Sequence, residues 1–130
     1  MMSYAGLEIV TLLALIEYSV LGAMVGRARL KYKVEAPATT GNAQFERYFR
    51  VHQNTLEALI VFLPAVWIFS LGVNYQIGVA LGVLFLLGRI LYANGYLNAP
   101  EKRAPGAIVT FAINTILVVG GLGALLVRAI

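Results

Sequence analysis

Four long apolar segments, separated by short polar stretches, constrain this chain more than any other feature. They cover about residues 6–26, 56–73, 77–97 and 107–127. A membrane-spanning helix needs about 20 apolar residues, because each residue adds 1.5 Å and the hydrocarbon core is about 30 Å thick. Only 12% of the 130 residues are charged, too few to cover the surface of a soluble domain. The sequence therefore predicts an all-α integral membrane protein, a bundle of four transmembrane helices.

The four segments and their polar flanks leave no room for a second domain. We expect a single transmembrane domain over residues 1–130, with helices at about 5–27, 45–72, 75–97 and 105–128. The first segment follows no positively charged start and no obvious cleavage site, so we expect a retained helix and not a signal peptide. Gly22 and Gly26, like Gly78 and Gly82, have the small-xxx-small spacing that predicts close helix packing.

Positive charge gathers in and beside two of the three predicted loops. These basic residues are Arg27, Arg29, Lys31, Lys33, Arg47, Arg50, Lys102 and Arg103. The second loop, about residues 72–76, has no Lys or Arg, and the carboxyl-terminal end has only Arg128. The positive-inside rule therefore predicts that both basic loops are cytoplasmic and both termini lie on the opposite side. Because membrane topology accounts for this charge, we expect no nucleic-acid partner.

Polar side chains continue from the first loop into the second apolar segment. Arg47, Arg50, Asn54 and Glu57 recur every three or four residues, within an arc of about 80° on a helix. The apolar run after Glu57 is only about 24 Å long, so Asn54 and Glu57 are expected at the cytoplasmic edge of the hydrocarbon. Ionisable groups at that depth usually face the bundle interior, another subunit or a wet cavity. The simpler alternative is that the arginines snorkel to lipid phosphates.

The third segment repeats this pattern near the same end. Arg89, Tyr92 and Tyr96 share one narrow helical face, either as an interfacial aromatic belt or as part of a shared pocket. With Arg29 and Arg103, the two stripes predict a cationic pocket that holds one acid. Such a pocket suits a small anion with more than one carboxylate and an amine, because Arg binds carboxylates through two parallel hydrogen bonds. An apolar second substrate could reach it through the bilayer.

The composition excludes several other kinds of chemistry. The chain has no cysteine, so disulfides, thiolate nucleophiles and cysteine-ligated metals are excluded. It has one histidine, His52, and a single histidine cannot build a metal site. No Ser-His-Asp set and no phosphate-binding glycine loop is present. We therefore interpret His52 as a hydrogen-bonding residue near the pocket and not as a metal ligand or general base.

Three stretches resemble segments of a known family. FERYFRVHQNTLEALIVFL, residues 45–63, resembles the E-R-x-x-R-x-H-x-N-x-x-E signature of the MAPEG family, membrane-associated proteins in eicosanoid and glutathione metabolism. GRILYANGYLNAPEKRAP, residues 88–105, is similar to the third-helix segment of that family, and KVEAPATTGNAQFER, residues 33–47, to its first loop. The resemblance covers nearly the whole chain in length and topology.

This resemblance implies a homotrimer that binds glutathione between neighbouring subunits near the cytosolic face. The positions that match glutathione contacts, with His52 at a site of Gln or His, are Arg29, Arg50, His52, Asn54, Glu57, Tyr92 and Tyr96. Arg47 and Arg89 join this predicted glutathione site from the two polar stripes. Arg103 matches an arginine credited with stabilising the glutathione thiolate and is the predicted catalytic residue. A nearby guanidinium favours the thiolate of a thiol whose ordinary pKa is about 8.5.

The leading interpretation is a glutathione transferase, with or without peroxidase activity, whose thiolate attacks hydrophobic electrophiles or lipid hydroperoxides. The alternative is a non-catalytic member of the same family that binds and presents lipids. A transporter or purely structural membrane protein would explain the glycine spacing but not the polar stripes. Two positions depart from the family pattern: Ala58 replaces a tyrosine, and Ala107 or Ile108 stands where prostaglandin-forming members have an arginine. The second departure weighs against a prostaglandin-forming role.

Overall fold

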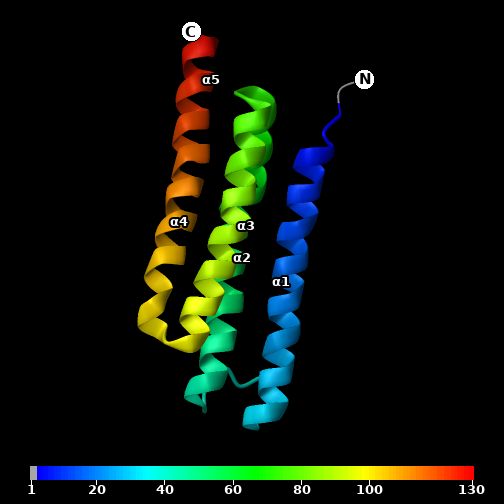
Figure 1. Ribbon diagram of the computed structural model, residues 1–130, viewed down its shortest axis with the longest axis vertical. Coiled ribbons are helices and arrows are strands. Elements are labelled where there is room, and N and C mark those ends of the chain that lie inside the picture. Colours follow the sequence, from blue (N-terminus) through cyan, green and yellow to red (C-terminus); the bar gives the residue numbers. More distant parts are fainter. Residues whose placement is uncertain (1–2) are drawn as a thin grey trace.

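The computed structural model describes residues 3–130, and all of its regular elements are helices. The first three helices are α1 (Ala5–Tyr32), α2 (Ala43–Gly72) and α3 (Tyr75–Asn98). A fourth rod follows, in the order η1 (Pro100–Arg103, a 3-10 turn), α4 (Ala104–Thr115), η2 (Ile116–Gly120, a π-helical segment) and α5 (Gly121–Ala129). The rods lie side by side, with the start of α1 and the end of α5 at one end and the first and third connections at the other (Figure 1).

Four of these rods are long and apolar enough to cross a membrane by length and composition: α1, α2, α3 and the rod Pro100–Ala129. Their outward faces carry large apolar side chains, among them Leu12, Ile60 and Phe111, which are 59%, 66% and 74% exposed. Such faces suit contact with lipid and not with water. The predicted all-α class with four membrane-spanning candidates is confirmed for the described residues.

Local sequence signals set the helix ends. The Asn42 side chain accepts a hydrogen bond from the Phe45 backbone N–H at 3.0 Å, and Asn74 does the same for Ile77 at 2.9 Å, so each asparagine caps a helix start. The first helix was expected to end near residue 27 but continues to Tyr32, and Lys33 ends it in a left-handed conformation with φ of 57°. The apolar run ends sooner than the helix because basic residues are also good helix formers.

Two of the predicted glycine packing sites bring α3 close to its neighbours. A Cβ at Gly82 would lie 2.7 Å from the Val10 side chain of α1, and one at Gly78 would lie 2.9 Å from the Ser70 Cα of α2. The prediction is confirmed for these two positions. For Gly26 it is wrong, because nothing lies within 4 Å of its Cβ position.

The main core lies between the start of the bundle and its middle. Phe62 of α2 and Phe85 of α3 are fully buried and stack with ring centroids 3.7 Å apart. Leu7 of α1 and Leu117 of η2 complete the four-rod contact. A smaller cluster at the loop end holds Phe45. The polar side chains of the next section lie between these two apolar clusters or border them.

Candidate functional site

An elongated groove of about 540 Å³ lies between α2, α3 and α4. Its polar lining residues are Asn54, Glu57, Arg89, Tyr92, Thr110 and Asn114. Its remaining length is apolar, with Val61, Phe111 and Val118 among the lining side chains. The groove can therefore hold a ligand with a polar part at one end and an apolar part along the rest.

A hydrogen bond between helices forms the polar end of the groove. The Asn54 amide on α2 donates to the Tyr92 hydroxyl on α3 at 2.5 Å, and Tyr92 is only 4% exposed. Gly106 of α4 lies directly against the Tyr92 backbone, where any Cβ would clash. The missing side chain at Gly106 thus lets α4 close one side of the groove.

Arg89 lies inside the bundle and not in the open groove. It is 4% exposed, and its guanidinium donates to the Thr55 hydroxyl at 2.7 Å and to the Thr110 hydroxyl at 3.3 Å. Its Cζ lies 4.2 Å from the centre of the Tyr92 ring, a cation–π contact. Arg89 therefore joins α2, α3 and α4 behind the polar end of the groove.

Two further predicted site residues face outward beside the groove. Glu57 and Arg50 are exposed, and neither makes a side-chain hydrogen bond within residues 3–130. Glu57 lines the groove next to Asn54. Both charges are available to an added molecule or to a second subunit.

Arg47 occupies a structural position at the end of α3. Its guanidinium donates to the carbonyl oxygens of Leu97 at 3.3 Å and Asn98 at 3.2 Å. These carbonyls belong to the last turn of the helix, where a positive charge is stabilised by the helix dipole. Arg47 thus fixes the third connection against α2.

Arg103 and Tyr96 continue the row of polar groups toward the loop end. Arg103 is exposed, donates to the Pro100 carbonyl at 2.8 Å, and lies 5.8 Å from the centre of the Tyr96 ring. The Tyr96 and Tyr92 rings are 5.8 Å apart. Cations and aromatic rings therefore alternate along α3, in the order Arg89, Tyr92, Tyr96 and Arg103.

Arg29 and His52 lie apart from this groove within one chain. Arg29 donates to the Ala38 carbonyl of the first loop at 2.7 Å and packs over the Phe45 ring at 4.8 Å. His52 stacks on Tyr18 of α1, with centroids 4.3 Å apart. Loop carbonyls need donors, which explains the position of Arg29. These contacts depend on the folded loop and could not be predicted from helical spacing.

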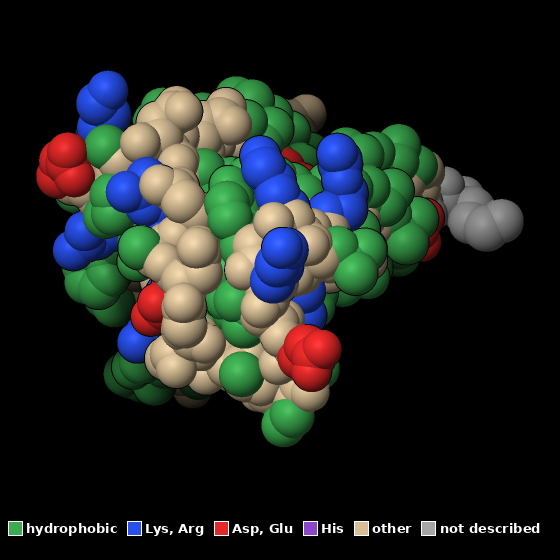
Figure 2. Space-filling model, turned by 90° about the horizontal axis from the view of Figure 1, so that it is seen from below, with side chains coloured by type: hydrophobic (Ala, Val, Ile, Leu, Met, Phe, Trp, Pro, Cys, Tyr) green, Lys and Arg blue, Asp and Glu red, His purple; other side chains and the backbone are tan. Residues whose placement is uncertain are grey.

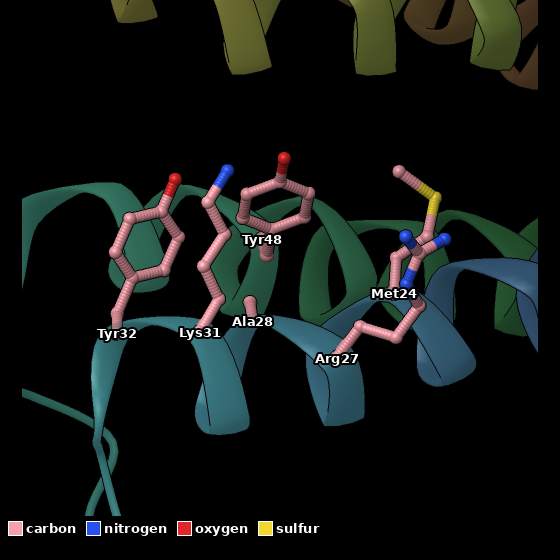
Figure 3. Close-up of a pocket in the computed structure, with 6 residues that line it drawn as sticks. All are labelled: Met24, Arg27, Ala28, Lys31, Tyr32 and Tyr48. Atoms are coloured by element: carbon pink, nitrogen blue, oxygen red, sulfur yellow. The ribbon is translucent and has the colours of Figure 1, made fainter.

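Basic side chains spread over the loop end of the molecule (Figure 2). A separate recess of about 210 Å³ lies there between α1 and α2. Figure 3 shows Lys31 and Arg27 extending from α1 on the same side, with Tyr32 and with Tyr48 from α2. The sequence signal for this recess, two cations four residues apart on one helix, was present but not used. Its two cations and two hydroxyls suit a phosphate or carboxylate group.

Sequence reasoning also missed Glu17 and the threonines that hold Arg89. Glu17 of α1 lines a third cavity, of about 270 Å³ between α1 and α3, together with Arg89. A signal existed, because Glu17 is a single acid in the middle of an apolar span. Thr55 and Thr110 gave no such signal, since threonine is common in membrane helices and often bonds its own helix.

Four apolar helices around a groove that is polar at one end define a multi-pass integral membrane protein. The sequence matches the model of the MAPEG family over residues 7–123, and the chain belongs to this family. An uncharacterized protein from Synechocystis is 52% identical over 114 residues, which cover 88% of this chain and 83% of that protein.

Two relatives carry functional names. Microsomal glutathione S-transferase 2 of Homo sapiens is 39% identical over 118 residues, 90% of this chain and 80% of that protein. Leukotriene C4 synthase of Bos taurus is 30% identical over 94 residues, 72% of this chain and 63% of that protein. Both similarities extend over most of the chain.

Proposed function

We propose that this protein is a membrane-bound glutathione S-transferase that conjugates glutathione to hydrophobic electrophiles. The carrying observation is the groove itself, which joins Asn54, Glu57 and Tyr92 at its polar end to an apolar channel along α2 and α4. Glutathione has two carboxylates, an amine and a thiol, and it needs a polar site. A hydrophobic electrophile needs the apolar remainder. The names of two relatives, a glutathione S-transferase and leukotriene C4 synthase, support the same chemistry.

The site residues divide the ligand among them. Glu57 binds the amine, because it is an exposed carboxylate at the groove edge. Arg50 binds a carboxylate, and the Asn54 and Tyr92 pair supplies hydrogen bonds to the peptide part. Tyr96 lies between this pair and Arg103, so the thiol is assigned to the region of Arg103.

Arg103 activates the thiol by favouring its anion. The sulfur loses its proton to solvent, and the guanidinium charge stabilises the thiolate that remains. The thiolate then forms a carbon–sulfur bond with the electrophile, whose leaving group departs with the displaced electron pair. The same thiolate would attack the oxygen–oxygen bond of a lipid hydroperoxide, which extends the proposal to peroxidase activity.

We also propose that the active form is a homotrimer, with each chain contributing one transmembrane domain over residues 1–130. In a single chain Arg29 and His52 do not face the groove, and Arg50 and Glu57 are open to the outside. A site shared between subunits would use such outward groups. Both basic loops, and with them the glutathione site, are placed on the cytoplasmic side by the positive-inside rule.

The decisive experiment is the ultraviolet absorbance of glutathione thiolate on addition of detergent-solubilised protein. We expect a thiolate signal with the wild type, a strongly reduced one with Arg103→Ala, and an unchanged one with the neighbouring control Lys102→Ala. No signal with the wild type would overturn the transferase proposal. An unchanged signal in Arg103→Ala would overturn the role of Arg103 alone. Conjugation of chlorodinitrobenzene then measures turnover.

A further inference from the structure

Two opposite charges lie near the middle of the bundle, on different helices. Glu17 is about 18 Å from the start of α1 and Arg89 about 21 Å from the start of α3, at 1.5 Å per residue. Both line the cavity between α1 and α3. Charged groups at such depth are costly unless they are paired, and they usually mark function. The pair therefore needs a role beyond helix packing.

Arg89 faces two cavities at once. It lines the groove between α2 and α4 as well as the cavity between α1 and α3. Its two terminal nitrogens bond Thr55 and Thr110, while its Nε is buried with no hydrogen-bond partner in the described chain. A guanidinium has five N–H donors, so the two threonines leave most of its capacity unused. The remaining capacity is open to a carboxylate.

Each cavity supplies one carboxylate that could take this position. Glu17 lines the cavity on the α1 side, and Glu57 lines the groove on the α4 side. Of the two, Glu17 is the carboxylate whose charge acts on Arg89. An Arg89 that turned instead to Glu57 would neutralise the acid at the groove edge. It would also leave the Tyr92 ring, which it now covers at 4.2 Å.

We propose that Glu17 is a positioning residue for the glutathione site. By attracting the Arg89 guanidinium toward α1, it leaves Glu57 free for the ligand amine. It also keeps Arg89 over Tyr92, whose hydroxyl accepts the hydrogen bond from Asn54. Glu17 acts through Arg89 and does not touch the ligand. The inference rests on the proposed function for its ligand, but not for the coupling between Glu17 and Arg89.

The test measures glutathione affinity by calorimetry on the purified full-length protein. We expect Glu17→Gln to raise the Kd about tenfold, which corresponds to about 1.4 kcal/mol. Glu17→Asp keeps the charge and should stay within about threefold of the wild type, a difference below that same energy. The control is Glu8→Gln, which removes an exposed acid from the same helix and should leave the Kd unchanged.

A second pair of variants shows whether Glu17 acts through Arg89. Arg89→Met keeps a long flexible side chain without charge, and in this background Glu17→Gln should cause no further change in Kd. A Kd for Glu17→Gln within twofold of the wild type, or an effect that persists beside Arg89→Met, would overturn the proposal. This comparison stands even where Glu17→Gln alone fails to fold, because the double variant leaves no unpaired charge in the bundle.

The two proposals fail in different ways. Wild-type protein that does not bind glutathione contradicts the transferase proposal. In that case the melting temperatures of the same four proteins still report the coupling. Glu17→Gln should lower the melting temperature of the wild type and leave that of Arg89→Met unchanged. Equal losses in both backgrounds would overturn the coupling itself.

Discussion

Asn54 and Tyr92 show how single side chains from different helices build the polar end of the groove. The Tyr92 hydroxyl is fixed by burial, and it in turn fixes the Asn54 amide. Glu57, one turn further along α2, has no such partner and is exposed. One part of the site is thus preorganised, while its charged part depends on the ligand for a partner.

Glu57 is therefore expected to contribute most to glutathione affinity among the α2 residues. Glu57→Gln should raise the Kd about tenfold or more, since a hydrogen bond to a charged group contributes about 1.5–3 kcal/mol. Asn54→Ala should raise it about threefold to tenfold, in line with a neutral hydrogen bond of about 0.5–1.5 kcal/mol. Gln53→Ala is the matched control, because Gln53 is exposed on the same turn. Equal Kd values for Glu57→Gln and Gln53→Ala would contradict this assignment.

How far single residues can be predicted from sequence depends on what holds them. Helical spacing places Asn54 and Glu57 on one face of α2, and both do line one groove. Spacing could not reveal that Arg47 bonds the last carbonyls of α3, or that Arg29 bonds a loop carbonyl. Those partners are backbone atoms whose positions exist only after folding. Arg89 belongs to the same group, since its depth was predictable but its two threonine partners were not.

At the scale of elements, the approach of α4 to α3 depends on one missing side chain. A Cβ at Gly106 would meet the backbone of Tyr92, which cannot rotate away as a side chain would. We expect Gly106→Ala to destabilise the protein by about 1–3 kcal/mol, the usual cost of overpacking. A lower melting temperature and weaker glutathione binding should appear together, because Tyr92 moves with α3.

Gly26→Ala provides the control for this prediction. It makes the same substitution in α1, where nothing lies within 4 Å of the Cβ position. The alanine should stabilise the helix by about 0.5–1 kcal/mol through its better propensity. A similar melting temperature for the two alanine variants would show that Gly106 does not control the spacing of α3 and α4.

The number and type of the long helices could be predicted from apolar length alone, but the internal form of the fourth rod could not. The π-helical segment Ile116–Gly120 interrupts a run that reads as one continuous helix. Gly120 and Gly121 there face the Phe69 ring of α2, with Cβ positions 3.6 Å from it. A local change of helix type of this kind depends on packing against another helix, and no residue pattern within the rod signals it.

For the whole molecule, the uneven distribution of charge predicts one orientation in the membrane. The end that carries the first and third connections is basic, while the turn between α2 and α3 has no Lys or Arg (Figure 2). The native chain has no cysteine, so single cysteines can report sidedness without background.

We expect cysteines at Lys33 and Lys102 to react with a membrane-impermeant maleimide only after the cells are permeabilised. A cysteine at Gln76 should react with intact cells, because it lies at the opposite end of the bundle. All three positions are exposed, so accessibility differs only through the membrane. Labelling of Lys33→Cys in intact cells would reverse the predicted orientation and place the glutathione site outside.

The depth of Glu17 and Arg89 also bears on how the chain enters the membrane during synthesis. Glu17 emerges from the ribosome with the first helix, whereas Arg89 emerges only with the third. Until then the acid has no counter-charge within the bilayer, where an isolated charge is unfavourable. We expect α1 to remain beside the insertion machinery until α3 arrives, so that the two leave together. A side-chain pair that organises the finished site would then also set the order in which its walls are assembled.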